Sequence, residues 1–139
     1  MLCKVAVVDD DRAIREALKD ALEREGYDVH VVPNGLKLMS VLQVVQPDII
    51  LLDVMMSWID GVDLCLALKA NRAYSDIPVI FMSARTSPED VRRGMSAGAA
   101  DYITKPFDLD RLLKRLESCK RENRPANQSE PGDAHPPAR

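Results

Sequence analysis

Three consecutive carboxylates, Asp9, Asp10 and Asp11, follow the apolar run VAVV near the start of the chain. Adjacent like charges repel one another more strongly as water is excluded, so such a cluster needs solvent or a counter-charge. A fourth carboxylate, Asp53, follows the apolar run IILL, and an ammonium group, Lys105, follows the segment YIT. If these groups meet, one lysine cannot neutralise them all, and we expect Mg²⁺, which prefers oxygen ligands, to supply the missing charge.

Asp53 is the candidate nucleophile, because it stands alone after four apolar residues at the end of a predicted strand. The two histidines, His30 in another predicted strand and His135 near the C-terminus, offer no general base for a Ser-His-Asp or Cys-His site. A carboxylate can attack phosphorus to give an aspartyl phosphate while a cation and a lysine neutralise the transferring oxygens. The hydroxyl of Ser83, which follows VIFM, is placed to donate a hydrogen bond to the new phosphoryl group.

Five short apolar runs rich in Val, Ile and Leu must position these groups. The runs lie at residues 4–8, 29–32, 48–52, 78–82 and 102–104. They alternate with longer segments of helical period, which predicts βα units and a parallel sheet covered on both faces. We therefore predict the α/β class, a doubly wound (βα)5 fold whose five-stranded parallel sheet has the order 2-1-3-4-5, with helices on both faces. Right-handed crossovers then bring the carboxyl ends of all five strands to one edge of the sheet.

The helix boundaries follow from local signals. Asp11 is a suitable N-cap for the first helix, and Gly26 suits the left-handed conformation that ends it. The last helix is predicted over residues 108–121. The apolar stripes of the helices are assigned to the core, and these stripes include Leu36 and Leu109.

Composition excludes several function classes. The formal net charge is −3, and Lys and Arg are dispersed rather than gathered in a stripe, so we expect no direct binding of nucleic acid. No segment approaches the roughly 20 apolar residues of a membrane span, and the N-terminal apolar run is too short for a signal peptide. Three widely spaced cysteines match neither a disulfide framework nor a metal-binding pair. We expect a cytoplasmic protein with no membrane contact.

The chain divides into two parts. Residues 1–122 carry all the predicted elements and make one domain, long enough to enclose a single core. Residues 123–139 are rich in proline and lack large apolar side chains, so we expect a disordered tail or the stub of an interdomain linker.

Four motifs in this order, VVDDD, PDIILLDVMMSWIDG, PVIFMSA and GAADYITKPF, resemble the receiver domain of bacterial two-component response regulators. The resemblance extends from residue 4 to about residue 120. It implies that Asp9, Asp10 and Asp53, with the backbone carbonyl of Met55, hold Mg²⁺. It also implies that Asp53 accepts the phosphoryl group from a phosphohistidine.

The resemblance assigns further roles at the ends of the last two strands. Ser83 corresponds to the switch hydroxyl, and Lys105 to the lysine that binds the phosphoryl oxygens. Tyr102 takes the place of the aromatic residue that turns inward on activation. Lys105-Pro106 takes the place of a cis peptide bond, which is rare for other residue pairs.

The chain departs from the family pattern at two places. A typical member has Met-Pro-x-Met-Asp-Gly where this chain has MSWIDG at residues 56–61, so Ser57 replaces the proline and Trp58, the single tryptophan, lies beside it. Ala100 interrupts the acidic pair of the subfamily that dimerises through the fourth helix, fifth strand and fifth helix. A homodimer through that face is one of the partner arrangements considered, and this substitution counts against it.

The leading hypothesis is a signalling switch. Its partners are a sensor histidine kinase or histidine phosphotransfer protein, and a downstream effector protein or output domain. Turnover of outside substrates is not expected, because an aspartate-nucleophile phosphatase needs a second acid where this chain has Met55; only slow self-dephosphorylation is expected. Two alternatives remain: a receiver fragment of a larger regulator whose output domain is missing, and a docking module that is never phosphorylated.

Overall fold

The structure is a computed structural model that describes residues 2–56 and 59–122. The predictions made for Ser57, for Trp58 and for a tail at residues 123–139 lie outside the described residues.

Five parallel strands form one sheet. They are β1 (Lys4–Val8), β2 (Asp28–Val32), β3 (Ile49–Asp53), β4 (Val79–Ser83) and β5 (Asp101–Thr104). Their order is β2-β1-β3-β4-β5, and every neighbouring pair is parallel. The predicted class and strand order are therefore confirmed, and each strand begins and ends within one residue of its predicted position.

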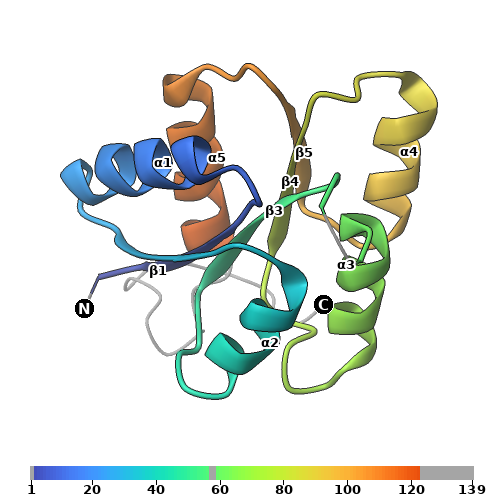
Figure 1. Ribbon diagram of the computed structural model, residues 1–139, viewed down its shortest axis with the longest axis horizontal. Coiled ribbons are helices and arrows are strands. Elements are labelled where there is room, and N and C mark those ends of the chain that lie inside the picture. Colours follow the sequence, from blue (N-terminus) through green and yellow to red (C-terminus); the bar gives the residue numbers. More distant parts are fainter. Residues whose placement is uncertain (1, 57–58, 123–139) are drawn as a thin grey trace, which may run out of the picture.

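Five helices cover the two faces of the sheet. They are α1 (Arg12–Arg24), α2 (Gly35–Leu42), α3 (Gly61–Ala70), α4 (Pro88–Ser96) and α5 (Leu109–Glu122). Figure 1 shows α1 and α5 on one side of the sheet and α2, α3 and α4 on the other. None of the described helices combines the length and the apolar character that crossing a membrane would require.

The core lies in two layers, one on each face of the sheet. Leu18 and Leu22 of α1 and Leu112 of α5 are buried on one face, and Leu38 of α2 and Leu68 of α3 are buried on the other. Each fully buried leucine contributes about 1.5–3 kcal/mol relative to an exposed one. Burial on both faces explains why the central strands are continuous apolar runs rather than alternating ones.

The predicted boundaries of α1 are confirmed. The carboxylate of Asp11 accepts hydrogen bonds from the backbone N–H groups of Ala13 and Ile14, which leaves these first-turn donors satisfied. At the other end, Gly26 has φ of +91°, a conformation that side chains with a Cβ rarely adopt.

Two core assignments are wrong. Leu36 is 78% exposed and Leu109 is 37% exposed. A Cβ on the neighbouring Gly35 would lie 2.9 Å from side-chain atoms of Ile59 and Leu64, so position 35 faces the core. Leu36 is one position further round the helix and therefore points away from it. Leu109 is the first residue of α5 and lies at the end of the apolar stripe rather than along it.

Gly61 holds the start of α3 directly against the end of β3. Its N–H donates to the carbonyl of Val54 at 2.8 Å. A Cβ at this position would collide with the carbonyl oxygen of Asp53 and would lie 2.8 Å from the Cα of Val54. The backbone of the strand end that carries Asp53 is therefore in contact with a residue that has no side chain.

We expect Gly61→Ala to lower the free energy of unfolding by about 1–3 kcal/mol, because the added methyl meets backbone that cannot move aside. Gly35→Ala is the matched control, since Gly35 is also the first residue of a helix but faces only the terminal methyl groups of Ile59 and Leu64. Urea denaturation of both variants measures the difference. An equal loss in the two variants would show that the backbone contact is not the cause.

Candidate functional site

Buried polar side chains gather at one edge of the sheet. Among the described residues, the buried polar or charged ones are Asp9, Asp53 and Ser83, which are 0%, 5% and 0% exposed. They lie at the carboxyl ends of β1, β3 and β4, and Lys105 follows the end of β5. Because uncompensated polar groups are costly to bury, their concentration at one place indicates a site rather than an accident of packing.

Lys105 is shared between two carboxylates. Its Nζ lies 2.8 Å from Oδ2 of Asp9 and 3.4 Å from Oδ2 of Asp53, and its side chain is 17% exposed. Burial by itself would lower the pKa of Lys105, but the hydrogen bond to Asp9 and the negative charges outweigh burial, so the pKa is raised. Lys105 is therefore a cation at neutral pH, held closer to Asp9 than to Asp53.

Asp53 keeps its charge at a cost. Burial and the charge of Asp9 raise its pKa from 3.8 to about 6, although the Met55 N–H and Lys105 act in the opposite direction. The Met55 N–H donates to Oδ1 of Asp53 at 3.0 Å. Oδ2 therefore faces Lys105 while Oδ1 is held by the chain, and a further cation at this point would relieve the cost of ionisation.

Asp9 is enclosed by donors. Its Oδ1 accepts the backbone N–H of Asp11 at 2.9 Å, and its Oδ2 accepts Lys105. Its backbone carbonyl accepts Nη1 of Arg15, on α1, at 2.7 Å. Arg15 therefore brings a second positive charge to the acids, which the sequence analysis missed; its spacing of one helical turn after the N-cap Asp11 was the available signal.

The acids fit a divalent cation. Carboxylate oxygens of Asp9, Asp10 and Asp53 lie within 4.8 Å of one another, with Asp10 exposed and the other two buried. All three are oxygen donors, and the exposed side leaves room for the waters that Mg²⁺ retains. Met55, expected to offer its carbonyl, lies beside this group through its hydrogen bond to Asp53.

A chain of hydrogen bonds links Ser83 to Tyr102. The Oγ of Ser83 accepts the backbone N–H of Arg85 at 3.0 Å, and the carbonyl of Arg85 accepts the Tyr102 hydroxyl at 2.8 Å. Tyr102 is 5% exposed, so its ring is already inward in this structure. The Lys105–Pro106 peptide is cis, as the resemblance implies.

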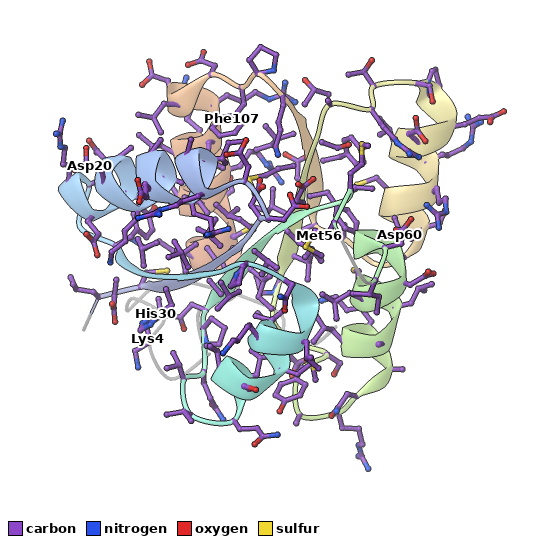
Figure 2. All side chains as sticks on the ribbon, viewed as in Figure 1. Lys4, Asp20, His30, Met56, Asp60 and Phe107 are labelled. Carbon is purple, nitrogen blue, oxygen red and sulfur yellow. The ribbon has the colours of Figure 1, made fainter. Side chains whose placement is uncertain are left out.

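The connection after β3 also contacts α4. Asp60 begins α3 by accepting the N–H of Val62 at 2.7 Å, and its other carboxylate oxygen lies 3.4 Å from Nη1 of Arg93 on α4. Figure 2 shows Asp60 at the start of α3, on the side that faces α4. The segment that follows Asp53 is thus joined to α4 by an ion pair at the surface.

Known proteins resemble this chain over nearly all of its described length. The family described as "Response regulator receiver domain" matches residues 5–117. Response regulator MprA of Mycobacterium bovis is 37% identical over 130 residues, which cover 94% of this chain and 56% of that protein. The chain therefore spans about half the length of the curated relatives that it matches.

Two solved structures have the same fold. The receiver domain of Francisella response regulator 1452 superposes with a TM-score of 0.82 at 33% identity, covering 88% of this chain and 99% of that one. The chemotaxis response regulator CheY4 of Vibrio cholerae gives a TM-score of 0.80 at 30% identity, covering 86% and 99%.

The raised pKa of Asp53 predicts a pH-dependent stability difference. Since its folded pKa of about 6 exceeds the ordinary 3.8, the folded state binds more protons in that window, and stability falls as pH rises through it. In metal-free buffer, we expect Asp53→Asn to be more stable than the wild type near pH 8, by up to about 3 kcal/mol. The gain should shrink near pH 5.

Urea denaturation at both pH values measures this difference. Asp63→Asn, which removes an exposed carboxylate from α3, is the control and should show no comparable change. A difference between wild type and Asp53→Asn that stays constant from about pH 5 to 8 would contradict the buried charge as its cause.

Proposed function

The chain belongs to the response regulator receiver family of two-component systems, and on that basis we propose that it is a phosphorylation-dependent switch with Asp53 as its phosphoacceptor. One observation carries this proposal: the buried polar residues of the described chain, Asp9, Asp53 and Ser83, all lie beside Lys105 at one edge of the sheet. If Lys105 and the two acids served only to stabilise the fold as ion pairs, the buried hydroxyl of Ser83 would not be needed beside them.

The transfer step follows from the orientation of Asp53. Its Oδ2, the oxygen not held by the Met55 N–H, attacks the phosphorus of a phosphohistidine. The new O–P bond forms as the P–N bond breaks, and the electron pair of the broken bond stays on the imidazole nitrogen. The ammonium group of Lys105 then exchanges its contact with the Asp53 carboxylate for a contact with the phosphoryl oxygens, which carry the negative charge after transfer. Mg²⁺ held by Asp9, Asp10, Asp53 and the Met55 carbonyl would neutralise charge on those oxygens.

The switch follows from the position of Ser83. A dianionic phosphoryl group on Asp53 attracts the Ser83 hydroxyl, and Ser83 is joined to Arg85 and Tyr102 by hydrogen bonds. Movement at Ser83 therefore reaches β5 and the connection to α4. Reversing a 1:99 population of two conformations needs about 5.5 kcal/mol of differential interaction, which a few charge-assisted hydrogen bonds supply.

The partners follow from this chemistry. A histidine kinase or histidine phosphotransfer protein donates the phosphoryl group, and an effector protein or output domain reads the altered surface. Turnover of outside substrates is not part of the proposal, since Met55 stands where a second catalytic acid would act. Slow hydrolysis of its own aspartyl phosphate by water is expected, and the cytoplasmic location stays a prediction.

We expect the protein to incorporate one phosphoryl group from acetyl phosphate, in a reaction that requires Mg²⁺ and is lost in Asp53→Asn. Intact-mass spectrometry measures the incorporation. Asp48→Asn is the control, because Asp48 is an exposed acid at the opposite end of β3 and should label like the wild type. If Mg²⁺ binds but neither the wild type nor Asp48→Asn is labelled, the alternative of a docking module replaces this proposal.

We also expect Asp10→Asn to weaken Mg²⁺ binding by more than about tenfold, since it removes one of the three carboxylates. Asp10 is exposed, so the fold should tolerate the substitution. Titration calorimetry with Mg²⁺ alone measures the affinity, and Asp20→Asn, on the exposed face of α1, is the control. Equal affinities in Asp10→Asn and the wild type would contradict the ligand assignment.

A further inference from the structure

The helix α4 rests on the sheet through a glycine. Gly94 is the residue of α4 that is buried, and α4 packs on β5 (Figure 1). A Cβ at position 94 would lie 2.9 Å from Cδ2 of Tyr102 and 3.1 Å from Cδ2 of Phe81, and real Cβ atoms essentially never approach within 3.0 Å. The helix can lie this close to the two rings only because residue 94 has no side chain.

Of these two rings, only that of Tyr102 can be displaced without entering the core. Phe81 is 0% exposed and lies on β4, which has strands on both sides. Tyr102 lies on β5, the edge strand, and keeps 5% exposure. The two rings are 6.1 Å apart and tilted by 54°, so Phe81 closes the inner side. A methyl group at position 94 would therefore displace Tyr102 towards solvent.

Displacement of Tyr102 would break a specific bond. The Tyr102 hydroxyl donates to the carbonyl of Arg85 at 2.8 Å, and the N–H of Arg85 donates to Oγ of Ser83 at 3.0 Å. An outward ring cannot keep the first of these bonds. The segment between β4 and α4 would lose its tie to β5, while Ser83 itself would keep its place at the end of β4.

We propose that Gly94 is a positioning residue for Tyr102: its missing side chain admits the inward ring and so couples α4 to the Arg85–Ser83 segment. The placement of the ring depends on packing alone. Its consequence for signalling rests on the proposed function. In that setting, position 94 determines how readily a phosphoryl group on Asp53 changes the surface formed by α4 and β5, without touching the transfer step.

The first test reads the ring directly, in the unphosphorylated 139-residue chain. The three tyrosines, Tyr27, Tyr74 and Tyr102, are labelled with 3-fluorotyrosine, and the Tyr102 signal is assigned by its loss in Tyr102→Phe. In Gly94→Ala we expect the ¹⁹F signal of Tyr102 to move to a solvent-exposed position and to acquire a solvent isotope shift. Ser96→Ala, at an exposed position on the same helix, should leave the signal unchanged.

The second test asks whether Tyr102 is the group that resists a side chain at position 94. We expect Gly94→Ala to lower the folding equilibrium constant in the wild type. In a Tyr102→Ala background the same change should lower that constant far less, or raise it by at most about fivefold, because alanine is the better helix former and only the contact with Phe81 remains. Destabilisation of the same size in both backgrounds, with an unmoved ¹⁹F signal, would mean that α4 shifts as a whole and would overturn the proposal.

The third test separates this proposal from the proposed function. Phosphoryl incorporation from acetyl phosphate is measured for Gly94→Ala and the wild type. Equal labelling with a displaced Tyr102 ring supports a role in positioning rather than in transfer. Absence of labelling in both proteins overturns the proposed function and leaves the ring placement to be judged by the first two tests. Loss of labelling in Gly94→Ala alone would contradict the separation of the two roles.

Discussion

The arrangement of the candidate site depends on one shared ammonium group. Lys105 lies between Asp9 and Asp53, two buried carboxylates that repel each other, and it is closer to Asp9. Two cations near the site, Lys105 and Arg15, are outnumbered by the carboxylates of Asp9, Asp10 and Asp53. Burial and the nearby charge of Asp9 raise the pKa of Asp53, and a cation bound among these carboxylates would offset that cost.

The rest of the fold holds these groups at short range. Parallel strands end together at one edge, so residues far apart in sequence meet there. Two glycines then bring helices unusually close: Gly61 sets α3 against the backbone of Asp53, and Gly94 sets α4 against Tyr102. Both helices lie on the same face of the sheet, and at each glycine an added methyl group would collide with the neighbouring residue. In the proposed switch, small movements at Asp53 or Ser83 would be transmitted to these helices through such contacts.

Much of this could be predicted from the sequence, for physical reasons. Apolar runs bounded by polar residues indicate buried parallel strands, and Asp11 and Gly26 mark the ends of α1, because these signals come from neighbouring residues. The assignment of Leu36 and Leu109 to the core failed, because an apolar side chain at a helix end is buried only if a neighbour covers it. The family resemblance supplied the remaining site residues, whose roles stay predictions.

The sequence by itself determined which chemical groups reach the carboxyl edge of the sheet, because local patterns of apolar and polar residues mark the strand ends. The general rules for alternating strands and helices then supply the strand order. Only the tertiary structure decided how those groups share charge and space. It brought Arg15 to the carbonyl of Asp9, divided Lys105 unequally between two acids, and placed Tyr102 inward beneath Gly94. Such distances depend on the packing of side chains from several elements at once, which no single stretch of sequence encodes.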